Sequence, residues 1–285
     1  MNAMPGSAGA LPPYCVEAFN IAADSENKIH DDTVASGFGF AGALVPGSAV
    51  FGYMSHQAVA RWGRAWLERG TLECRFSQPV YHGRQVTVSA AEREDGLGLE
   101  VHGEAGVCAT GSAALPAPEA APSEAAPSLD GYPLAPRPEV RPAADERSLA
   151  EGAVLCTAPY AMDEAQARQW HADLRETAPI YADEKLMHPA TLLRLCNWVL
   201  TENVFLGPWI HVGSKVHNFN PMPVGASLCG RGVVLRNYEH KGHRLVDLDV
   251  LVVIDGKVPA ARILHSAIYL PRQVREARAS APVQA

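Results

Sequence analysis

The segment DSENKIHDDTVASGFGFAGALVPGSAVFGYMSH, residues 24 to 56, places a polar cluster ahead of a glycine-rich turn and an apolar run. The polar side chains are Asp24, Asn27, His30 and Asp32. A helix is expected to begin near Ser48, directly after Pro46-Gly47. The free N–H groups and the dipole of a helix N-terminus favour negative charge. An acid/base side chain beside such a helix end is suited to moving a proton next to a carbonyl group.

The same segment resembles a known family. Residues 27–32, Asn-Lys-Ile-His-Asp-Asp, resemble the N-P-[LI]-H-x-D signature of the MaoC-like (R)-specific enoyl-CoA hydratases, which have the hot-dog fold. Gly37-Phe38 stands where that family has its G-F, and residues 44–47 stand where it has I-V-H-G before the central helix. The resemblance implies a hot-dog domain in the first half of the chain.

Three positions depart from the family pattern. Lys28 replaces the usual Pro, and Pro46 replaces the usual His before the Gly. The family's catalytic Asp lies two residues before the Asn, where this chain has Ser25. These departures affect the prediction of hydratase chemistry more than the prediction of a hot-dog fold.

The resemblance assigns roles to individual residues. It implies that His30 is the acid/base residue, since its imidazole titrates near neutral pH. Asp24 is the expected partner if a one-residue bulge brings it level with the family's Asp. The Gly47 N–H is expected to bind the thioester oxygen. Further substrate contacts are predicted for Asn27, Gly37, Phe38 and Ser48.

A structural role competes with each of these functional roles. His30 could be a loop histidine that bonds to nearby backbone. Asn27 could brace the loop, because Asn is a common turn former. Pro46-Gly47 could simply begin a helix, since Pro is pre-set for a first turn.

Composition limits the class of protein. The 285 residues carry a net charge of −7 without long charged runs, which argues against nucleic acid or an anionic membrane as partner. No signal peptide and no apolar run of about 20 residues is evident, so a cytoplasmic protein is expected. The six cysteines are scattered without a C-x-x-C motif, which predicts buried free thiols.

The chain divides into two halves joined by a linker. Residues 14–114 are expected to form the first domain and residues 150–272 the second, with a disordered N-terminus over 1–13 and a frayed tail over 273–285. Residues 115–149 are rich in Ala, Pro and Glu, which predicts an extended surface linker that adds little to a core.

The second half repeats the plan of the first. An offset of 142 residues aligns Leu44 with Leu186, Pro79 with Pro221, and Gly83 with Gly225. Each half has one long apolar helix, over 49–69 and over 189–204, followed by short strands. We therefore predict an α+β fold of two tandem hot-dog domains, each an antiparallel sheet wrapped around a helix, which together imitate a dimer.

The second half offers weaker candidates for chemistry. Tyr181, Asp183 and His188 occupy the region analogous to the first-half site, but no N-x-x-H precedes them. The second half is therefore expected to shape the acyl pocket. The spacing of His211, His217, His240, His243 and His265 does not suggest metal ligands, so no metal site is predicted.

The resemblance implies a MaoC-like hydratase/dehydratase that adds water to an enoyl thioester of coenzyme A, or of acyl carrier protein, or removes it from the hydroxyacyl thioester. No metal or redox cofactor is required by this chemistry, and a homodimer of double hot-dog chains is possible. One rival is a hot-dog thioesterase, which would release a free thiol. The other is a non-catalytic acyl-CoA-binding protein on a degenerate hydratase scaffold, favoured by Ser25 and Pro46.

Overall fold

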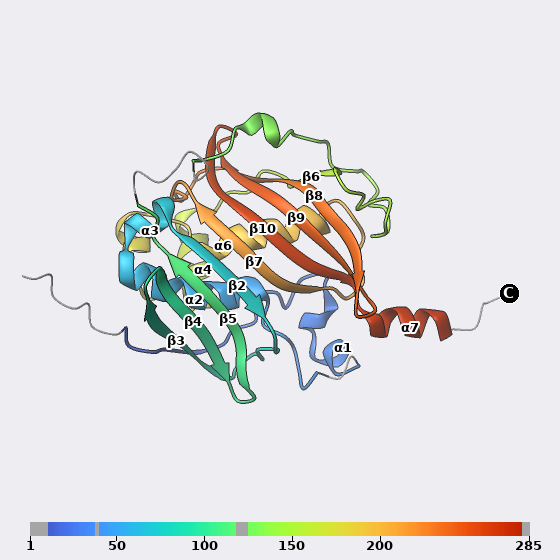
Figure 1. The fold of residues 1–285 in the computed structure, drawn as a ribbon, viewed down its shortest axis with the longest axis horizontal. Coiled ribbons are helices and arrows are strands. Elements are labelled where there is room, and N and C mark those ends of the chain that lie inside the picture. The colour runs from blue at the N-terminus through green and yellow to red at the C-terminus, as the bar shows by residue number, and fades with distance from the viewer. Residues whose placement is uncertain (1–10, 38–39, 118–124, 281–285) are drawn as a thin grey trace, which may run out of the picture.

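One antiparallel sheet of ten strands runs through both halves of the protein (Figure 1). The computed structural model describes residues 11–37, 40–117 and 125–280. The strands follow the order β1-β3-β4-β5-β2-β7-β10-β9-β8-β6, so the second five mirror the first five about the β2–β7 pair. The fold is α+β, with two hot-dog halves that share a continuous sheet.

The first half contains β1 (Tyr14–Glu17), the 3₁₀ turn η1 (Lys28–His30), α1 (Asp32–Gly37), α2 (Gly47–Trp62), α3 (Arg64–Arg69), β2 (Thr71–Phe76), β3 (Gln85–Arg93), β4 (Gly96–Gly103) and β5 (Gly106–Ala114). The second half contains β6 (Val154–Cys156), α4 (Glu164–Asp173), α5 (Ile180–Asp183), α6 (Ala190–Thr201), β7 (Ile210–Asn218), β8 (Leu228–His240), β9 (His243–Ile254) and β10 (Val258–Leu270).

The register between β2 and β7 confirms the repeat. Thr71 lies opposite His217, and Arg75 lies opposite Gly213. The residue 142 positions after Thr71 is Gly213, and the residue 142 positions before His217 is Arg75, so the repeat converts the first pair into the second. Glu73 and Lys215 lie opposite each other and differ by the same 142 residues. A pseudo-twofold axis therefore passes between these two side chains.

The two long helices pack against the same face of the sheet (Figure 1). The buried face of α2 includes Phe51, Tyr53 and Met54, each fully shielded from solvent. The apolar run of residues 49–69, predicted as one helix, is in fact two helices. Gly63 separates α2 from α3 because its φ of 56° is incompatible with helix continuation.

The linker does more than cross the surface. Its described part contains the short turn η3 (Leu129–Gly131), after which Tyr132 packs on Leu251 and Val253 of β9. The Tyr132 hydroxyl donates to Asp249, 2.9 Å away. The outer face of β9 is thereby covered, so the prediction that this segment adds little to a core was wrong for Tyr132 and for the fully buried Leu149.

The C-terminal segment also differs from expectation. Residues of the predicted frayed tail form α7 (Arg272–Ser280), which projects from the end of the sheet where β10 finishes (Figure 1). Arg275 pairs with Glu239 of β8 at 3.0 Å and donates to the Gly242 carbonyl. Interactions of this kind anchor the first turn of α7 to the β8–β9 hairpin. None of the described helices is long and apolar enough to cross a membrane.

Candidate active site

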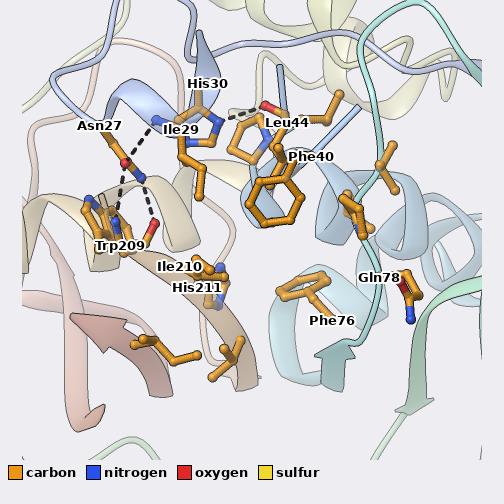
Figure 2. A pocket seen from close by; sticks show the side chains of 18 of the residues that line it. Asn27, Ile29, His30, Phe40, Leu44, Phe76, Gln78, Trp209, Ile210 and His211 are labelled. Carbon is orange, nitrogen blue, oxygen red and sulfur yellow. Dashed lines mark hydrogen bonds between the residues drawn. The ribbon is translucent and has the colours of Figure 1, made fainter. Parts of the chain in front are cut away.

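Asn27 fastens the polar loop of the first half to the second half. Its amide nitrogen donates to the Trp209 carbonyl at 3.0 Å, and its amide oxygen lies 3.5 Å from the backbone nitrogens of Trp209 and Ile29 (Figure 2). The same oxygen caps η1, which carries His30. The side-chain amide of Asn27 is thus engaged in bracing, and it sits at the edge of the site.

His30 presents one free ring nitrogen to the site. Its Nδ1 lies 2.7 Å from the Leu44 carbonyl oxygen, which can only accept, so Nδ1 carries the proton. Within the described residues no hydrogen bond engages Nε2, which is therefore available as a base. Burial lowers the pKa of His30 below its ordinary value of 6.5, partly opposed by the bond to Leu44. The imidazole is consequently neutral at physiological pH.

The N-terminus of α2 lies beside His30. Pro46 is the N-cap, and Gly47 and Ser48 open the first turn, where N–H groups have no intrahelical acceptor. A side chain at position 47 would not fit, because its Cβ would lie 2.7 Å from Nδ1 of His211 and 2.8 Å from Cε2 of Phe76. Gly47 is thus required for close packing as well as for a helix start.

An apolar cavity of about 320 Å³ opens between His30 and this helix end (Figure 2). Figure 2 shows Trp209 on one side and Phe40 and Phe76 on the other, with His30 and His211 apart on different walls. Both halves contribute, since the walls also include Val50 of α2, Val212 of β7 and Ile268 of β10. Such a space suits an acyl chain, with few polar groups to fix its orientation.

A larger, more polar groove of about 830 Å³ shares part of this lining. Asn27, His30, Pro46, Asn197 and Trp209 line both spaces, so the two spaces meet at His30. The structure thereby joins an apolar compartment to a polar one at the candidate base.

Charged residues also line the groove. Arg137 pairs with Glu202 at 3.1 Å and Arg141 pairs with Glu26 at 2.8 Å. Arg194 stacks over the rings of Trp170 and Trp198, with its guanidinium 4.6 Å from each ring centroid. A polar, solvated ligand segment would suit this compartment.

The structure brings some of the predicted residues together and leaves others apart. His30 and Gly47 share the apolar cavity, and Ser48 lines the groove. Asp24 is exposed on the groove side, and it is not among the residues that line the apolar cavity. Gly37 ends α1, exposed, and lines neither space within the described part of the chain. Phe38 lies outside the described residues.

Asp32 braces the loop. Its carboxylate accepts a hydrogen bond from the Ala43 backbone nitrogen at 2.7 Å. Asp31 also has a local role, since its carboxylate accepts from the backbone nitrogens of Thr33 and Val34 at the start of α1. Both carboxylates therefore shape the loop that carries His30.

Sequence reasoning missed two residues of the site, both from the second half. His211 on β7 and Asn197 on α6 each have a buried polar atom without a partner among the described residues, Nδ1 and Oδ1 respectively. Both side chains line the apolar cavity. Their positions depend on how β7 and α6 pack against α2, and no motif around either residue reveals this.

The equivalent cavity of the second half is closed. Only about 10 Å³ remains between Leu67, Met187, Pro189, Leu192, Asn218, Asn220, Pro221 and Met222. Subtracting or adding 142 maps every one of these residues onto a residue that lines the open cavity, for example Pro189 onto Gly47 and Met222 onto Val80. Four of these positions carry a larger residue than their first-half counterparts and fill the second space, namely Met187, Pro189, Leu192 and Met222.

A buried acidic network lies near the start of α6 instead. Glu176 accepts a hydrogen bond from His56 of α2 at 2.8 Å and lies 3.1 Å from Nε2 of His188. Tyr181 packs against His188 and is also buried, whereas Asp183 is exposed. Glu176 lines none of the three spaces described above, and its hydrogen bond with His56 joins the two halves.

Comparison with known proteins supports the fold. The sequence matches no protein-family model and no curated protein. A conserved hypothetical protein from Mycobacterium tuberculosis with a double hotdog fold superposes with a TM-score of 0.59 at 12% identity, over 91% of this chain and 96% of that chain. A MaoC domain protein from Chloroflexus aurantiacus, described as a dehydratase, gives 0.58 at 11% identity, over 92% and 94%.

A MaoC-like dehydratase gives a TM-score of 0.56 at 13% identity, over 91% of this chain and 98% of that chain. The chain therefore has the double hot-dog fold that is found in MaoC-like dehydratase proteins. Because identity is so low, these likenesses define the fold, and the activity has to be argued from the site.

Proposed function

We propose that the protein is a hydratase/dehydratase of acyl thioesters, which adds water across an enoyl thioester or removes it from a 3-hydroxyacyl thioester. The observation that carries the proposal is that His30, whose Nδ1 is held by the Leu44 carbonyl, lines the same cavity as Gly47 at the N-terminus of α2. A base and an oxyanion-stabilising helix end are what proton transfer next to a carbonyl requires.

The two compartments suit the two ends of such a substrate. The acyl chain would occupy the apolar cavity, and the polar arm of coenzyme A or of acyl carrier protein would lie in the groove. The thioester would then sit at the junction, with its oxygen toward the N–H groups of Gly47 and Ser48.

In the hydration direction, Nε2 of His30 would take a proton from water as the oxygen attacks the β-carbon. The enolate-like oxygen would be stabilised at the N-terminus of α2, and the proton on His30 would return to the α-carbon. These steps move only water and protons, so the reaction requires no cofactor.

Asp24 has a secondary role in this proposal. Its exposed carboxylate shares the groove with His30, and a negative charge there would favour the imidazolium that forms during the reaction. Because solvent screens an exposed charge, Asp24→Asn should reduce the rate by only a few-fold.

The test is the loss of absorbance of the conjugated thioester with a panel of enoyl-CoAs, for the wild type and for His30→Ala. We expect the variant to lose about 100-fold or more in kcat/KM, the range for removing a general base. His102→Ala is the matched control, since His102 is a solvent-exposed histidine on β4 that pairs with Glu100.

Two other outcomes would reject the proposal. Release of a free thiol without hydration would identify a thioesterase. Tight binding of acyl-CoA with no turnover of any enoyl thioester would identify a binding protein on a hydratase scaffold.

A further inference from the structure

His211 brings an unpaired nitrogen to the helix end of the candidate site. It belongs to β7 of the second half, its exposed fraction is 8%, and its Nδ1 has no hydrogen-bond partner in the described part of the chain. The same nitrogen lies 2.7 Å from the place where a Cβ of Gly47 would stand. Because the cavity wall around it is apolar, a ligand atom is the natural partner for this nitrogen.

The other ring nitrogen of His211 is fixed by the protein. Nε2 lies 2.8 Å from the Ser214 hydroxyl, which in turn lies 3.0 Å from Nδ1 of His265. A longer contact of 3.2 Å joins Nε2 to the Gly213 carbonyl. A hydroxyl both donates and accepts, so Ser214 can supply a proton to Nε2 while accepting one from His265.

This arrangement permits a tautomer of His211 with its proton on Nδ1. If His265 donates to Ser214 and Ser214 donates to Nε2, Nδ1–H points into the cavity as a hydrogen-bond donor. Burial lowers the pKa of His211 to about 3, so the ring stays neutral in either tautomer. The contact with the Gly213 carbonyl favours the tautomer that has its proton on Nε2, whereas an oxygen atom bound beside Nδ1 would favour Nδ1–H.

We propose that His211 is a second substrate-binding residue, whose Nδ1–H donates a hydrogen bond to the thioester oxygen held at the N-terminus of α2. The identification of this oxygen as that of a thioester rests on the proposed function. The oxygen would then receive hydrogen bonds from both halves, one from the Gly47 backbone and one from the imidazole of β7. Gly47 is necessary for this arrangement because any side chain there would displace the imidazole.

The pseudo-equivalent position in the second half supports this assignment. Arg69 occupies it, and its guanidinium Nε donates to the Pro116 carbonyl at 3.2 Å. The closed second space therefore lacks both the room and the imidazole. The open cavity and the unpaired nitrogen therefore occur together at one of the two pseudo-equivalent sites.

Three substitutions separate substrate contact from a structural role. His211→Asn keeps an amide N–H near the position of Nδ1, whereas His211→Gln reaches Ser214 but leaves the cavity side empty. His211→Leu removes both polar groups. For hydration of an enoyl-CoA we expect His211→Leu and His211→Gln to lose about 10- to 100-fold in kcat, with His211→Asn within a few-fold of the wild type. Rescue by Gln and not by Asn would overturn the proposal.

A binding measurement keeps this inference separate from turnover. Calorimetry would compare a dethia analogue of acyl-CoA, in which a methylene replaces sulfur and the carbonyl remains, with a thioether analogue that has no carbonyl. The wild type and His211→Asn should prefer the ketone by about tenfold or more, whereas His211→Leu and His211→Gln should lose most of this preference, because only the Gly47 N–H remains to bind the carbonyl oxygen. Equal preference in all four proteins would overturn the proposal even if enoyl-CoA is hydrated.

Failure of the proposed function would look different. In that case neither the wild type nor any variant would hydrate an enoyl thioester. The preference for the ketone, and its reduction in His211→Gln, would still be measured. Ser214→Ala provides a second variant that leaves the imidazole in place. It should fall between the wild type and His211→Leu, because His211 keeps its position but loses the partner that sets its tautomer; an effect equal to that of the wild type would count against the tautomer argument.

Discussion

At the scale of single residues, Gly47 stands where the packing leaves no room for a side chain. A Cβ there would come within 2.8 Å of Phe76 and closer still to His211. We expect Gly47→Ala to lower kcat/KM at least about tenfold, since small displacements of reacting groups are costly, and to destabilise the fold by about 1–3 kcal/mol. Steady-state kinetics and urea unfolding measure the two effects.

Gly131→Ala is the control for this substitution, because no atom lies within 4 Å of its added Cβ. It should change neither quantity. If Gly47→Ala behaves like Gly131→Ala, then His211 and Phe76 can move aside to accommodate the added Cβ. The close approach at the helix end would then not be needed for activity or stability.

The protonation of His30 predicts the pH dependence of activity. Burial lowers the pKa of His30 below 6.5, so the base form persists at neutral pH and is lost only at lower pH. In the hydration direction kcat/KM should therefore stay level through neutral pH and fall on an acid limb below pH 6.5. Asp24→Asn should retain this limb; a limb that disappears with Asp24 would transfer the essential ionisation to the carboxylate.

The proximity of His30 and Gly47 could be predicted because their motif is local. His30 and Gly47 lie within one contiguous segment, and the loop geometry that brings them together depends on neighbours such as Asp32 and Asn27. His211 could not be predicted in this way, because strand pairing brings it to Gly47 from the other half of the chain.

At the scale of elements, the Glu176 network joins β1, α2 and the loop before α6. The Glu176 side chain is only 2% exposed, and it accepts hydrogen bonds from His56 and from the backbone nitrogens of Thr177 and Ala178. His56 also stacks on Tyr14 of β1, with ring centroids 3.7 Å apart. A single carboxylate thus holds elements from both halves.

Removing this carboxylate should destabilise the protein. Burial alone would raise the pKa of Glu176, but the hydrogen bonds from His188 and His56 outweigh it and lower the pKa below its ordinary value of 4.5. Glu176→Gln replaces an accepting oxygen by an amide NH₂ group, which is itself a donor and faces the donors that the carboxylate binds. The substitution should lower the free energy of unfolding, measured in urea near neutral pH, by about 3 kcal/mol.

The sign of the pH effect follows from the lowered pKa. The stabilisation is fully present above the ordinary value of 4.5 and is lost as the pH falls through the lower folded-state value, so the difference between wild type and variant should shrink in acid. Glu100→Gln, in an exposed Glu–His pair with His102, is the control and should leave the unfolding midpoint unchanged. A constant difference down to low pH would contradict the assignment.

Element boundaries show where sequence patterns fail. The apolar periodicity of residues 49–69 continues through Gly63, so it cannot reveal that the backbone there turns to positive φ and ends α2. The linker is poor in large apolar residues, yet Tyr132 packs on an apolar patch of β9 that exists only in the assembled sheet.

At the scale of the whole molecule, the two halves keep one geometry and differ in what fills it. The open cavity of the first half is about 320 Å³ and its counterpart about 10 Å³. We therefore expect one molecule of a non-reactive acyl-CoA thioether to bind per chain, measured by calorimetry or native mass spectrometry. A stoichiometry of two would mean that Met187 and Met222 can move aside.

The double hot-dog architecture itself was predictable, because landmarks at a constant offset recur in the sequence. Leu44 and Leu186, matched from the sequence, form equivalent bridges to Tyr81 and Pro223, which also differ by 142 residues. The closure of the second cavity was not predictable, since it depends on side-chain volumes at positions whose proximity is set by the fold.

The pair on the pseudo-twofold axis has a consequence for how the halves recognise each other. Glu73 and Lys215 face one another there, with their charged groups 3.9 Å apart. In a symmetric assembly of two identical first halves, Glu73 would face its own copy, and in one of two second halves Lys215 would do so. Like charges directly opposite each other disfavour both of these assemblies. Two fragments made by cutting the chain within residues 115–149 would consequently pair with each other rather than with copies of themselves. Covalent fusion and the Glu73–Lys215 pair are then two separate ways in which this molecule ensures that unlike halves associate.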